Sequence, residues 1–192
     1  NWLLYYPAEW LTAHWTDLLI TTNEEDAVRA RNLPVKKTVK VNGVGVDLTR
    51  FDPPVDRRVA RNLLGLAQDA QVLMTVGEHS IRKNHSTLLK AAAGLPGVHV
   101  VLCGWGEGRQ ELENLTDELG MRERVHFLGF RDDLPQVYPA ADVFVFPSLQ
   151  EGLPVALMEA MACGLPAVVS NVRGCVDLIS QEEGGFLRDP GD

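Results

Sequence analysis

Short apolar runs that alternate with helix-like stretches constrain the fold of this chain more than any other feature. Six such runs occur in its second part, at 71–77, 99–104, 125–130, 142–147, 166–170 and 185–190. Strands that alternate with helices form parallel sheets, and strands that are apolar throughout are buried on both faces. The sequence therefore predicts an α/β fold, with a parallel sheet of roughly six strands and flanking helices.

The first 44 residues show a related pattern but are too few to form such a domain. An aromatic and aliphatic stripe over 2–15 predicts a helix bent at Pro7, and 17–22 predicts a strand that leads into a helix capped by Asn23. A glycine-containing junction, Asn42-Gly-Val-Gly-Val-Asp47, follows a short strand. We therefore expect 1–44 to be the last part of a preceding α/β domain with its linker, and 45–192 to be a second domain.

The composition argues against several classes of protein. A net charge of -8 over 192 residues does not suit a nucleic-acid partner, because such proteins need a basic surface to neutralise phosphates. Three cysteines without a Cys-x-x-Cys pair favour buried thiols in a reducing compartment. With no leader sequence and no unbroken run of about 18 apolar residues, we expect neither a signal peptide nor a membrane span. We expect a cytoplasmic location, with the inner face of the membrane as an alternative.

Two glutamates frame one predicted helix in the motif Glu151-Gly-Leu-Pro-Val-Ala-Leu-Met-Glu159. The motif follows an apolar strand, so Glu151 and Gly152 fall in a turn at the carboxyl edge of the sheet, where α/β sheets bind ligands. Pro154 suits the first turn of a helix, and Gly164 and Pro166 end it, which predicts a helix over about 153–163. The free N–H groups at its start suit a diphosphate, although single glutamates are more often solvated or ion-paired.

Two adjacent cations, Arg82 and Lys83, follow the strand at 71–77. Because the carboxyl ends of parallel strands share one edge, these cations can meet the same diphosphate as the 153–163 helix, unless they are merely solvated. His79 and His85 flank them, and we expect exposed loop histidines without a role, with contact to a ligand as the alternative. His126 alternates with apolar residues and is expected to be packed within its strand.

The loop Gly104-Trp-Gly-Glu-Gly108 follows another strand and suggests a dinucleotide-binding turn. The pattern is incomplete, because Arg109 occupies the position of the third glycine of Gly-x-Gly-x-x-Gly. A dinucleotide-dependent oxidoreductase domain therefore remains an alternative function. The sequence contains no cluster of metal ligands and no Asp-x-Asp pair, so we expect no metal site.

Taken together, Glu151-x7-Glu159 and the following Ala160-Met-Ala-Cys-Gly-Leu-Pro166 resemble the signature of the retaining glycosyltransferases of family 4, in the GT-B superfamily. The resemblance extends over essentially the whole chain. It implies that 45–192 is the Rossmann-like C-terminal domain of a GT-B fold, truncated at its C-terminus, and that 1–44 belongs to the N-terminal, acceptor-side domain. Trp2-Leu-Leu-Tyr-Tyr-Pro7, Gly43-Val-Gly-Val-Asp47 and Arg82-Lys-Asn-His85 suggest the bacterial capsular and exopolysaccharide branch.

The resemblance also implies roles for single residues. Arg82 and Lys83 would stabilise the leaving diphosphate, and Glu151 would orient the donor sugar; these three are the expected catalytic residues. The others would bind the donor: Gly77, Gly104, Gly129, Phe130, Arg131, Gly152, Leu153, Glu159 and Gly174. Glu159 would hold the ribose, and 129–131 would lie near the nucleobase. Arg173 is a further candidate beside the diphosphate. The sequence departs from the family at Glu78, where an arginine is usual.

The implied activity is transfer of a sugar, with retention, from a nucleotide-sugar donor to an acceptor hydroxyl, in bacterial cell-surface polysaccharide synthesis. The leading donor is a UDP-sugar, and no separate cofactor is implied. The acceptor would be a saccharide or a lipid-linked saccharide, with peripheral membrane association through the N-terminal domain. A non-catalytic nucleotide-sugar-binding domain is the other alternative, and we expect residues 1–192 alone to be inactive in transfer.

Overall fold

The chain divides into two compact units, Asn1–Gly45 and Val46–Asp192. The computed structural model describes residues 2–51, 55–180 and 183–190. The first unit contains a helix, two strands and a second helix: α1 (Trp2–Ala13), β1 (Leu19–Thr21), α2 (Glu24–Ala30) and β2 (Thr38–Lys40). The strands β1 and β2 pair in parallel. As predicted, Asn23 caps α2, since its side chain accepts a hydrogen bond from Asp26 N at 2.8 Å.

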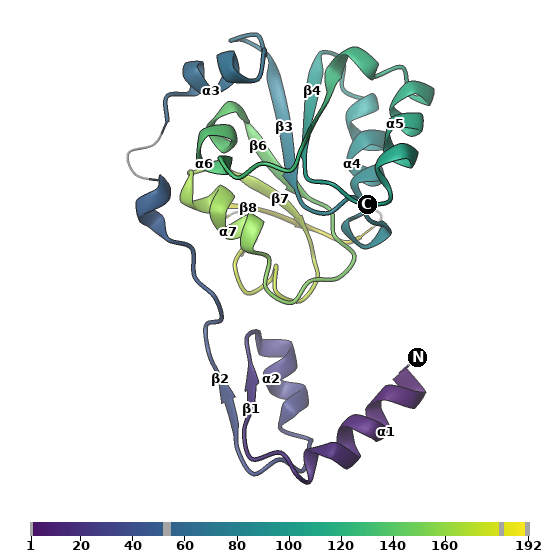
Figure 1. The fold of residues 1–192 in the computed structure, drawn as a ribbon, viewed down its shortest axis with the longest axis vertical. Helices are drawn as coiled ribbons and strands as arrows, with labels where there is room; N and C mark the ends of the chain where they lie inside the picture. The colour runs from purple at the N-terminus through teal and green to yellow at the C-terminus, as the bar shows by residue number, and fades with distance from the viewer. Residues whose placement is uncertain (1, 52–54, 181–182, 191–192) are drawn as a thin grey trace. The chain divides into compact units, whose positions relative to one another are not determined.

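The second unit is built on a six-stranded sheet whose neighbouring strands all pair in parallel (Figure 1). Its strands are β3 (Gln71–Val76), β4 (Val98–Cys103), β5 (Val125–Gly129), β6 (Val143–Phe146), β7 (Ala167–Ser170) and β8 (Gly185–Arg188). The ends of each strand lie within two residues of the ends of a predicted apolar run. The α/β fold with a parallel sheet and flanking helices is therefore confirmed.

Helices cover both faces of this sheet (Figure 1). They are α3 (Arg57–Leu63), α4 (His85–Ala93), α5 (Arg109–Glu118), α6 (Leu134–Val137) and α7 (Val155–Ala162), with 3-10 turns η1 (Leu48–Phe51), η2 (Ile81–Lys83), η3 (Arg122–Arg124) and η4 (Tyr138–Ala140). Alternate residues of β4 separate the two cores. Val100 and Leu102 pack with α4 and α5, whereas Val101 and Cys103 pack with α3, α6, η4 and α7. The near-complete burial of β4 explains why its sequence is apolar except at the half-buried His99.

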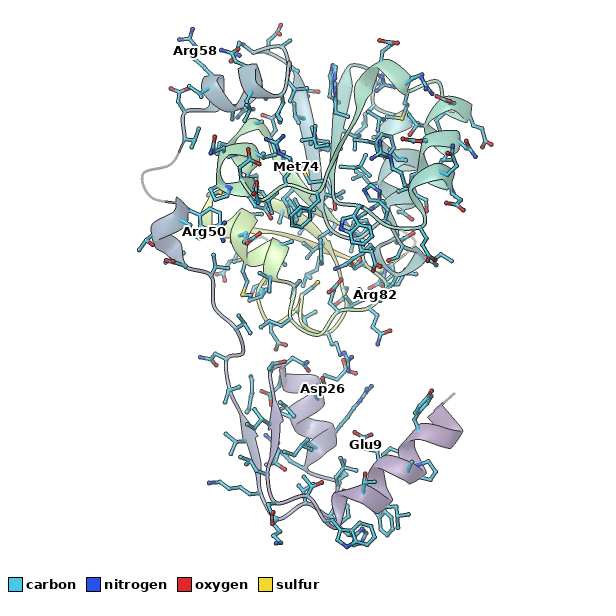
Figure 2. All side chains as sticks on the ribbon, in the orientation of Figure 1. Glu9, Asp26, Arg50, Arg58, Met74 and Arg82 are labelled. Atoms are coloured by element: carbon cyan, nitrogen blue, oxygen red, sulfur yellow. The ribbon has the colours of Figure 1, made fainter. Side chains whose placement is uncertain are left out.

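The strand order, β5-β4-β3-β6-β7-β8, places a switch point between β3 and β6. The chain runs outward from β3 through β4 to β5, and then returns to β6 on the other side of β3. The connections after β3 and β6 therefore lead to helices on opposite faces of the sheet, α4 and α7, and open α/β sheets bind ligands in the crevice at such a point. Figure 2 shows Arg82 at the edge of this unit and Met74 in its interior.

One local prediction needs correction. The helix expected at 153–163 is α7, Val155–Ala162, and it starts later because Pro154 is its N-cap, with ψ of 89°. Gly152 and Leu153 therefore belong to the turn before the helix. The predicted first helix is α1, and Pro7 lies inside it. Among the described residues, no helix has the length and apolar character needed to cross a bilayer.

Candidate functional site

The loops after β3 and β6 meet through a buried ion pair. Lys83 Nζ lies 2.7 Å from Glu151 Oε1, and Arg82 Nη1 lies 3.7 Å from the same oxygen. The Glu151 side chain is 6% exposed and that of Lys83 is 13% exposed, whereas Arg82 is 46% exposed. Lys83 Nζ also lies 4.7 Å from the centroid of the Phe146 ring. The structure thus brings together the three residues expected to be catalytic.

Three further hydrogen bonds fix these two loops against each other. Leu149 N donates to Arg82 O at 2.8 Å, and Arg82 Nη1 donates to Gln150 O at 3.2 Å. Asn84 Nδ2 donates to Pro147 O at 3.1 Å. Asn84 adopts φ of 53°, a left-handed conformation that asparagine tolerates better than most residues. The geometry of the ion pair is therefore set by the backbone as well as by the charges.

A cavity of about 340 Å³ opens beside this ion pair, at the carboxyl ends of β3, β4 and β5. Four residues expected to bind the donor line it: Gly77, Gly104, Phe130 and Arg131. Glu78, where the family usually has an arginine, also lines it. Four more lining residues were not singled out for this site from the sequence: Val76, Cys103, Trp105 and Leu134. Trp105, an aromatic residue in a glycine-rich loop after a strand, could have been recognised. Burial raises the pKa of the Cys103 thiol to about 12, so this thiol stays protonated.

Two residues of the cavity lining lie next to the cations of the ion pair. A Cβ added at Gly77 would lie 3.4 Å from Lys83 Cε, so a side chain there would press on the lysine. Glu78, which also lines the cavity, lies 3.9 Å from Arg82 Nη2. Arg131 is held by a two-point ion pair with Asp133, at 2.7 and 2.5 Å, and Phe130 is 74% exposed.

The glycines of the 104–108 loop serve loop packing. A Cβ on Gly104 would lie 1.9 Å from Gly77 O, and one on Gly106 or Gly108 would lie 2.5 or 2.9 Å from His79 O. Each glycine therefore permits the close approach of the loop after β3. Gly104 N also donates to Gly129 O at 2.7 Å. Close packing accounts for this pattern without a dinucleotide.

The expectation that His79 and His85 are exposed is wrong. Their exposed fractions are 0% and 2%, their ring centroids lie 5.5 Å apart, and the loop at 104–108 packs over His79. Within the described part of the chain, their ring nitrogens have no hydrogen-bond partner. Burial lowers the pKa of both rings, to about 3 for His85. His126 is packed in β5 as expected, with Nε2 at 2.9 Å from His99 Nδ1.

The second glutamate of the motif has a partner that the sequence did not indicate. The fully buried Tyr138 of η4 places its hydroxyl 3.0 Å from Glu159 Oε2 and 3.1 Å from Ala156 O. Burial raises the pKa of Tyr138, and the neighbouring Glu159 carboxylate raises it further. The phenol therefore remains a hydrogen-bond donor, and it orients Glu159 on α7.

The loop after β7 contacts the turn that contains Glu151 and Gly152. Arg173 Nε donates to Glu151 O at 2.9 Å, and Gly174, with φ of 78°, approaches so closely that a Cβ would lie 2.5 Å from Gly152 O. Gly174 and Gly152 thus lie together, with Leu153 next in the chain. The site combines cations, an oriented carboxylate and a neighbouring cavity, which suits an anionic ligand with a hydroxyl-bearing group. Among the described residues, no group of three or more His, Cys, Asp or Glu could hold a metal ion.

Comparison with known proteins identifies one family. The family described as "Glycosyl transferases group 1" matches residues 56–192. The protein named "Putative glycosyltransferase EpsD" of Bacillus subtilis is 39% identical over all of this chain and 52% of its own length. The UDP-Gal:alpha-D-GlcNAc-diphosphoundecaprenol alpha-1,3-galactosyltransferase of Escherichia coli is 34% identical over 97% of this chain and 50% of its own length. The chain thus spans about half the length of these relatives.

Solved structures are similar to this chain over all or nearly all of its length. The crystal structure of Anabaena HepE in complex with UDP and glucose has a TM-score of 0.89 and 27% identity, and the match covers all of this chain and 55% of that one. Sucrose-phosphate synthase from Thermosynechococcus elongatus has a TM-score of 0.85 and 31% identity, over 97% of this chain and 48% of that one.

Proposed function

The chain belongs to the glycosyl transferases of group 1, and from this premise we propose that the carboxyl edge of its second sheet binds a nucleotide-sugar donor. The observation that carries the proposal is the Lys83–Glu151 ion pair at the switch point of the sheet, beside the cavity of about 340 Å³. Lys83 and Arg82 supply positive charge to a diphosphate. The nucleoside binds in the cavity beyond Gly77.

In this proposal Lys83 and Arg82 stabilise the negative charge that develops on the leaving diphosphate. Such preorganised charges commonly contribute about 10²–10³-fold to a rate. Glu151 accepts hydrogen bonds from the donor sugar, and the backbone of Gly152 and Leu153 contacts sugar and phosphate near the start of α7. Glu159, oriented by Tyr138, binds the ribose. Gly174 supports this turn from the loop after β7.

The nucleobase, in this proposal, lies in the cavity at the ends of β4 and β5, where Gly104, Gly129, Phe130 and Arg131 are found. Phe130 and Trp105 offer exposed aromatic faces to a base. The Arg131–Asp133 pair gives this wall a fixed arrangement of donors and acceptors. Uracil is the proposed base, because the related HepE was solved in complex with UDP and with UDP-glucose.

For the whole protein we propose transfer with retention, as a family 4 hexosyl or other glycosyl transferase of bacterial capsule or exopolysaccharide synthesis. The E. coli relative, whose name gives a diphosphoundecaprenol-linked sugar as the acceptor, supports a saccharide or lipid-linked saccharide acceptor. Action at the inner face of the membrane is part of the same proposal. In this proposal, residues 1–44 belong to the acceptor-side domain, and residues 45–192 form the donor domain.

The main alternative, a dinucleotide-dependent oxidoreductase, is not favoured. The glycines on which it rests already have a packing role against Gly77 and His79. A non-catalytic domain that binds nucleotide sugars would share the same pocket. It differs only in lacking transfer to an acceptor.

A thermal-shift experiment on the full-length protein separates these possibilities. At about 100 times their dissociation constant, UDP and UDP-glucose should stabilise the protein by about 2.7 kcal/mol, a rise in Tm of roughly 5–10 °C. NAD should produce no shift. A shift with NAD alone would favour the oxidoreductase. Donor binding without transfer to any acceptor would favour the non-catalytic domain.

Two variants test the residue roles. Glu159→Ala should abolish most of the UDP-induced shift, whereas Glu118→Ala, an exposed glutamate of α5, should leave it unchanged. Glu151→Gln removes the carboxylate that pairs with Lys83. It should therefore weaken UDP-glucose binding while retaining or strengthening binding of UDP, because Lys83 becomes free to contact the diphosphate. A parallel loss of UDP and UDP-glucose binding in this variant would contradict the sugar-orienting role.

A further inference from the structure

Two consecutive residues of the loop after β7 contact two consecutive residues of the loop after β6. Arg173 Nε donates a hydrogen bond of 2.9 Å to Glu151 O. The next residue, Gly174, approaches Gly152 O so closely that a Cβ would lie 2.5 Å from it, and its φ of 78° also favours glycine. This contact joins neighbouring strands of the sheet at their ligand-binding edge. Arg173 therefore acts on the backbone of the turn that carries Glu151.

Glu151 is held on its other side by its carboxylate. Lys83 Nζ lies 2.7 Å from Oε1, and Arg82 Nη1 lies 3.7 Å from it. The backbone of Glu151 is thus fixed from β7 and its side chain from β3. The Glu151 side chain is only 6% exposed, so both its backbone and its carboxylate are held in a fixed position.

The peptide plane connects the Arg173 contact to ligand binding. Glu151 C=O and Gly152 N–H belong to one planar trans peptide, so they point in opposite directions. An arginine that holds the carbonyl also sets the direction of the Gly152 N–H and the position of the Glu151 Cα. Rotation of this plane would displace both the amide and the carboxylate.

We propose that Arg173 is a positioning residue for sugar recognition, acting through the Glu151–Gly152 peptide and not through contact with the diphosphate. This inference rests on the proposed function of the site. In the proposed function, nucleotide affinity depends on Lys83, Arg82 and Glu159. Their side-chain hydrogen bonds and ion pairs, as far as the described residues show them, are with residues other than Arg173. Recognition of the sugar depends on the exact placement of Glu151.

The test compares UDP and UDP-glucose, or UDP-galactose if it binds more tightly, on the full-length protein by calorimetry. Arg173→Ala should leave the Kd of UDP within about twofold and raise that of the UDP-sugar about tenfold, with kcat falling at least about tenfold. Arg173→Lys should restore part of the loss, since an ammonium group can also donate to a carbonyl. If the alanine variant does not fold, the lysine variant provides the same comparison.

Arg124→Ala is the matched control. Arg124 Nη1 also donates to backbone carbonyls, those of Leu95 and Val98 at 3.1 and 2.8 Å, but beside the amino end of β4. Its loss should affect stability alone. Equal weakening of UDP and UDP-sugar in the Arg173 variants would indicate contact with the diphosphate and overturn the proposal, as would no change in either. A wild-type protein that binds neither ligand would instead contradict the proposed function.

Discussion

A cluster of one carboxylate and two cations lies on each side of β6 in the chain, and the surroundings of the two clusters differ. Asp142, just before the strand, pairs with Arg57 and Arg61. Glu151, in the loop after the strand, pairs with Lys83 and Arg82. The first cluster lies at the amino edge of the sheet and the second at the carboxyl edge.

The amino-edge cluster has many structural hydrogen bonds. Arg61 is 2% exposed, and it donates to Ala140 O at 3.1 Å, to Gln68 O and to Asp142 Oδ2 at 3.0 Å. Asp142 also accepts from Val72 N at 2.7 Å, which ties β6 to the start of β3. The carboxyl-edge cluster instead lies next to a cavity, and the rings of His79 and His85 have no hydrogen-bond partner among the described residues. Similar charges therefore serve stability at one edge and, in the proposed function, ligand binding at the other.

The largest effect is expected from breaking the amino-edge cluster. Arg61→Met leaves Asp142 without its buried partner and removes donors from two carbonyl groups, and should lower the free energy of unfolding by about 3–5 kcal/mol. Urea unfolding measures this loss. UDP affinity of the folded protein should be unchanged.

Arg58→Met is the control for this variant, because Arg58 is exposed on the same helix and its side chain points outward (Figure 2). It should change stability by no more than about 0.5 kcal/mol. A selective loss of UDP affinity in Arg61→Met would remove the distinction between the two edges.

A slightly smaller effect is expected at the carboxyl edge, and in a different property. Lys83→Met should reduce kcat of the full-length enzyme about 10²-fold, about 2.7 kcal/mol of transition-state stabilisation, because it removes a cation from the leaving diphosphate. Its cost in stability should be below that of Arg61→Met, since Arg82 still neutralises Glu151. Steady-state kinetics and urea unfolding provide the two measurements.

Lys90→Met, at an exposed position of α4, is the control for Lys83→Met. Full activity in Lys83→Met would show that this ion pair is structural, like the one at Asp142.

The smallest predicted effect is a loss of stability at acid pH, which should begin at the carboxyl edge of the sheet. Burial, together with the neighbouring His79 and Lys83, lowers the pKa of His85 to about 3. The stability that depends on neutral His85 is therefore complete above its unfolded pKa of about 6.5 and is lost as pH falls from there toward 3. At pH 5 the loss from this residue should be about 2 kcal/mol.

The amino edge should respond only at lower pH. Burial opposes ionisation of Asp142, but the hydrogen bonds from Arg57 and Val72 outweigh it and lower its pKa. Its contribution is thus present above an unfolded pKa of about 3.9 and is lost below it. Between pH 7 and 5, protonation of the histidines should therefore cause most of the loss of stability. The charged groups that act on His79 are Arg109 and Glu113.

Urea unfolding at pH 7 and pH 5 tests this order. His85→Leu should remove about 2 kcal/mol of the decline, whereas His14→Gln, at an exposed position just after α1, should leave it intact. An identical decline in His85→Leu and wild type would show that this ring does not cause the acid sensitivity.

Much of the fold and part of the site follow from local sequence patterns. The apolar runs predicted all six strands of the second sheet. Parallel strands share their carboxyl edge, so the pattern also predicted that Arg82, Lys83 and Glu151 would lie at one edge. The start of α7 was less predictable, because Pro154 suits both a first helical turn and the cap before it.

The burial of His79 and His85 could not be predicted in this way. It depends on the 104–108 loop, whose glycines let it close over the loop after β3. Similarly, neither the contact of Tyr138 with Glu159 nor that of Arg173 with the Glu151 carbonyl has a sequence signal. Each joins residues about twenty positions apart, on elements whose facing surfaces are set by packing.

The sequence by itself determined the class of fold, the parallel sheet and the residues available at its carboxyl edge, because these follow from periodicity over a few neighbouring residues. Only the tertiary structure decided that β6 returns beside β3, that Lys83 reaches Glu151, and that the two histidines are enclosed. Strand order and loop packing depend on contacts between residues far apart in the chain, and local periodicity contains no information about them.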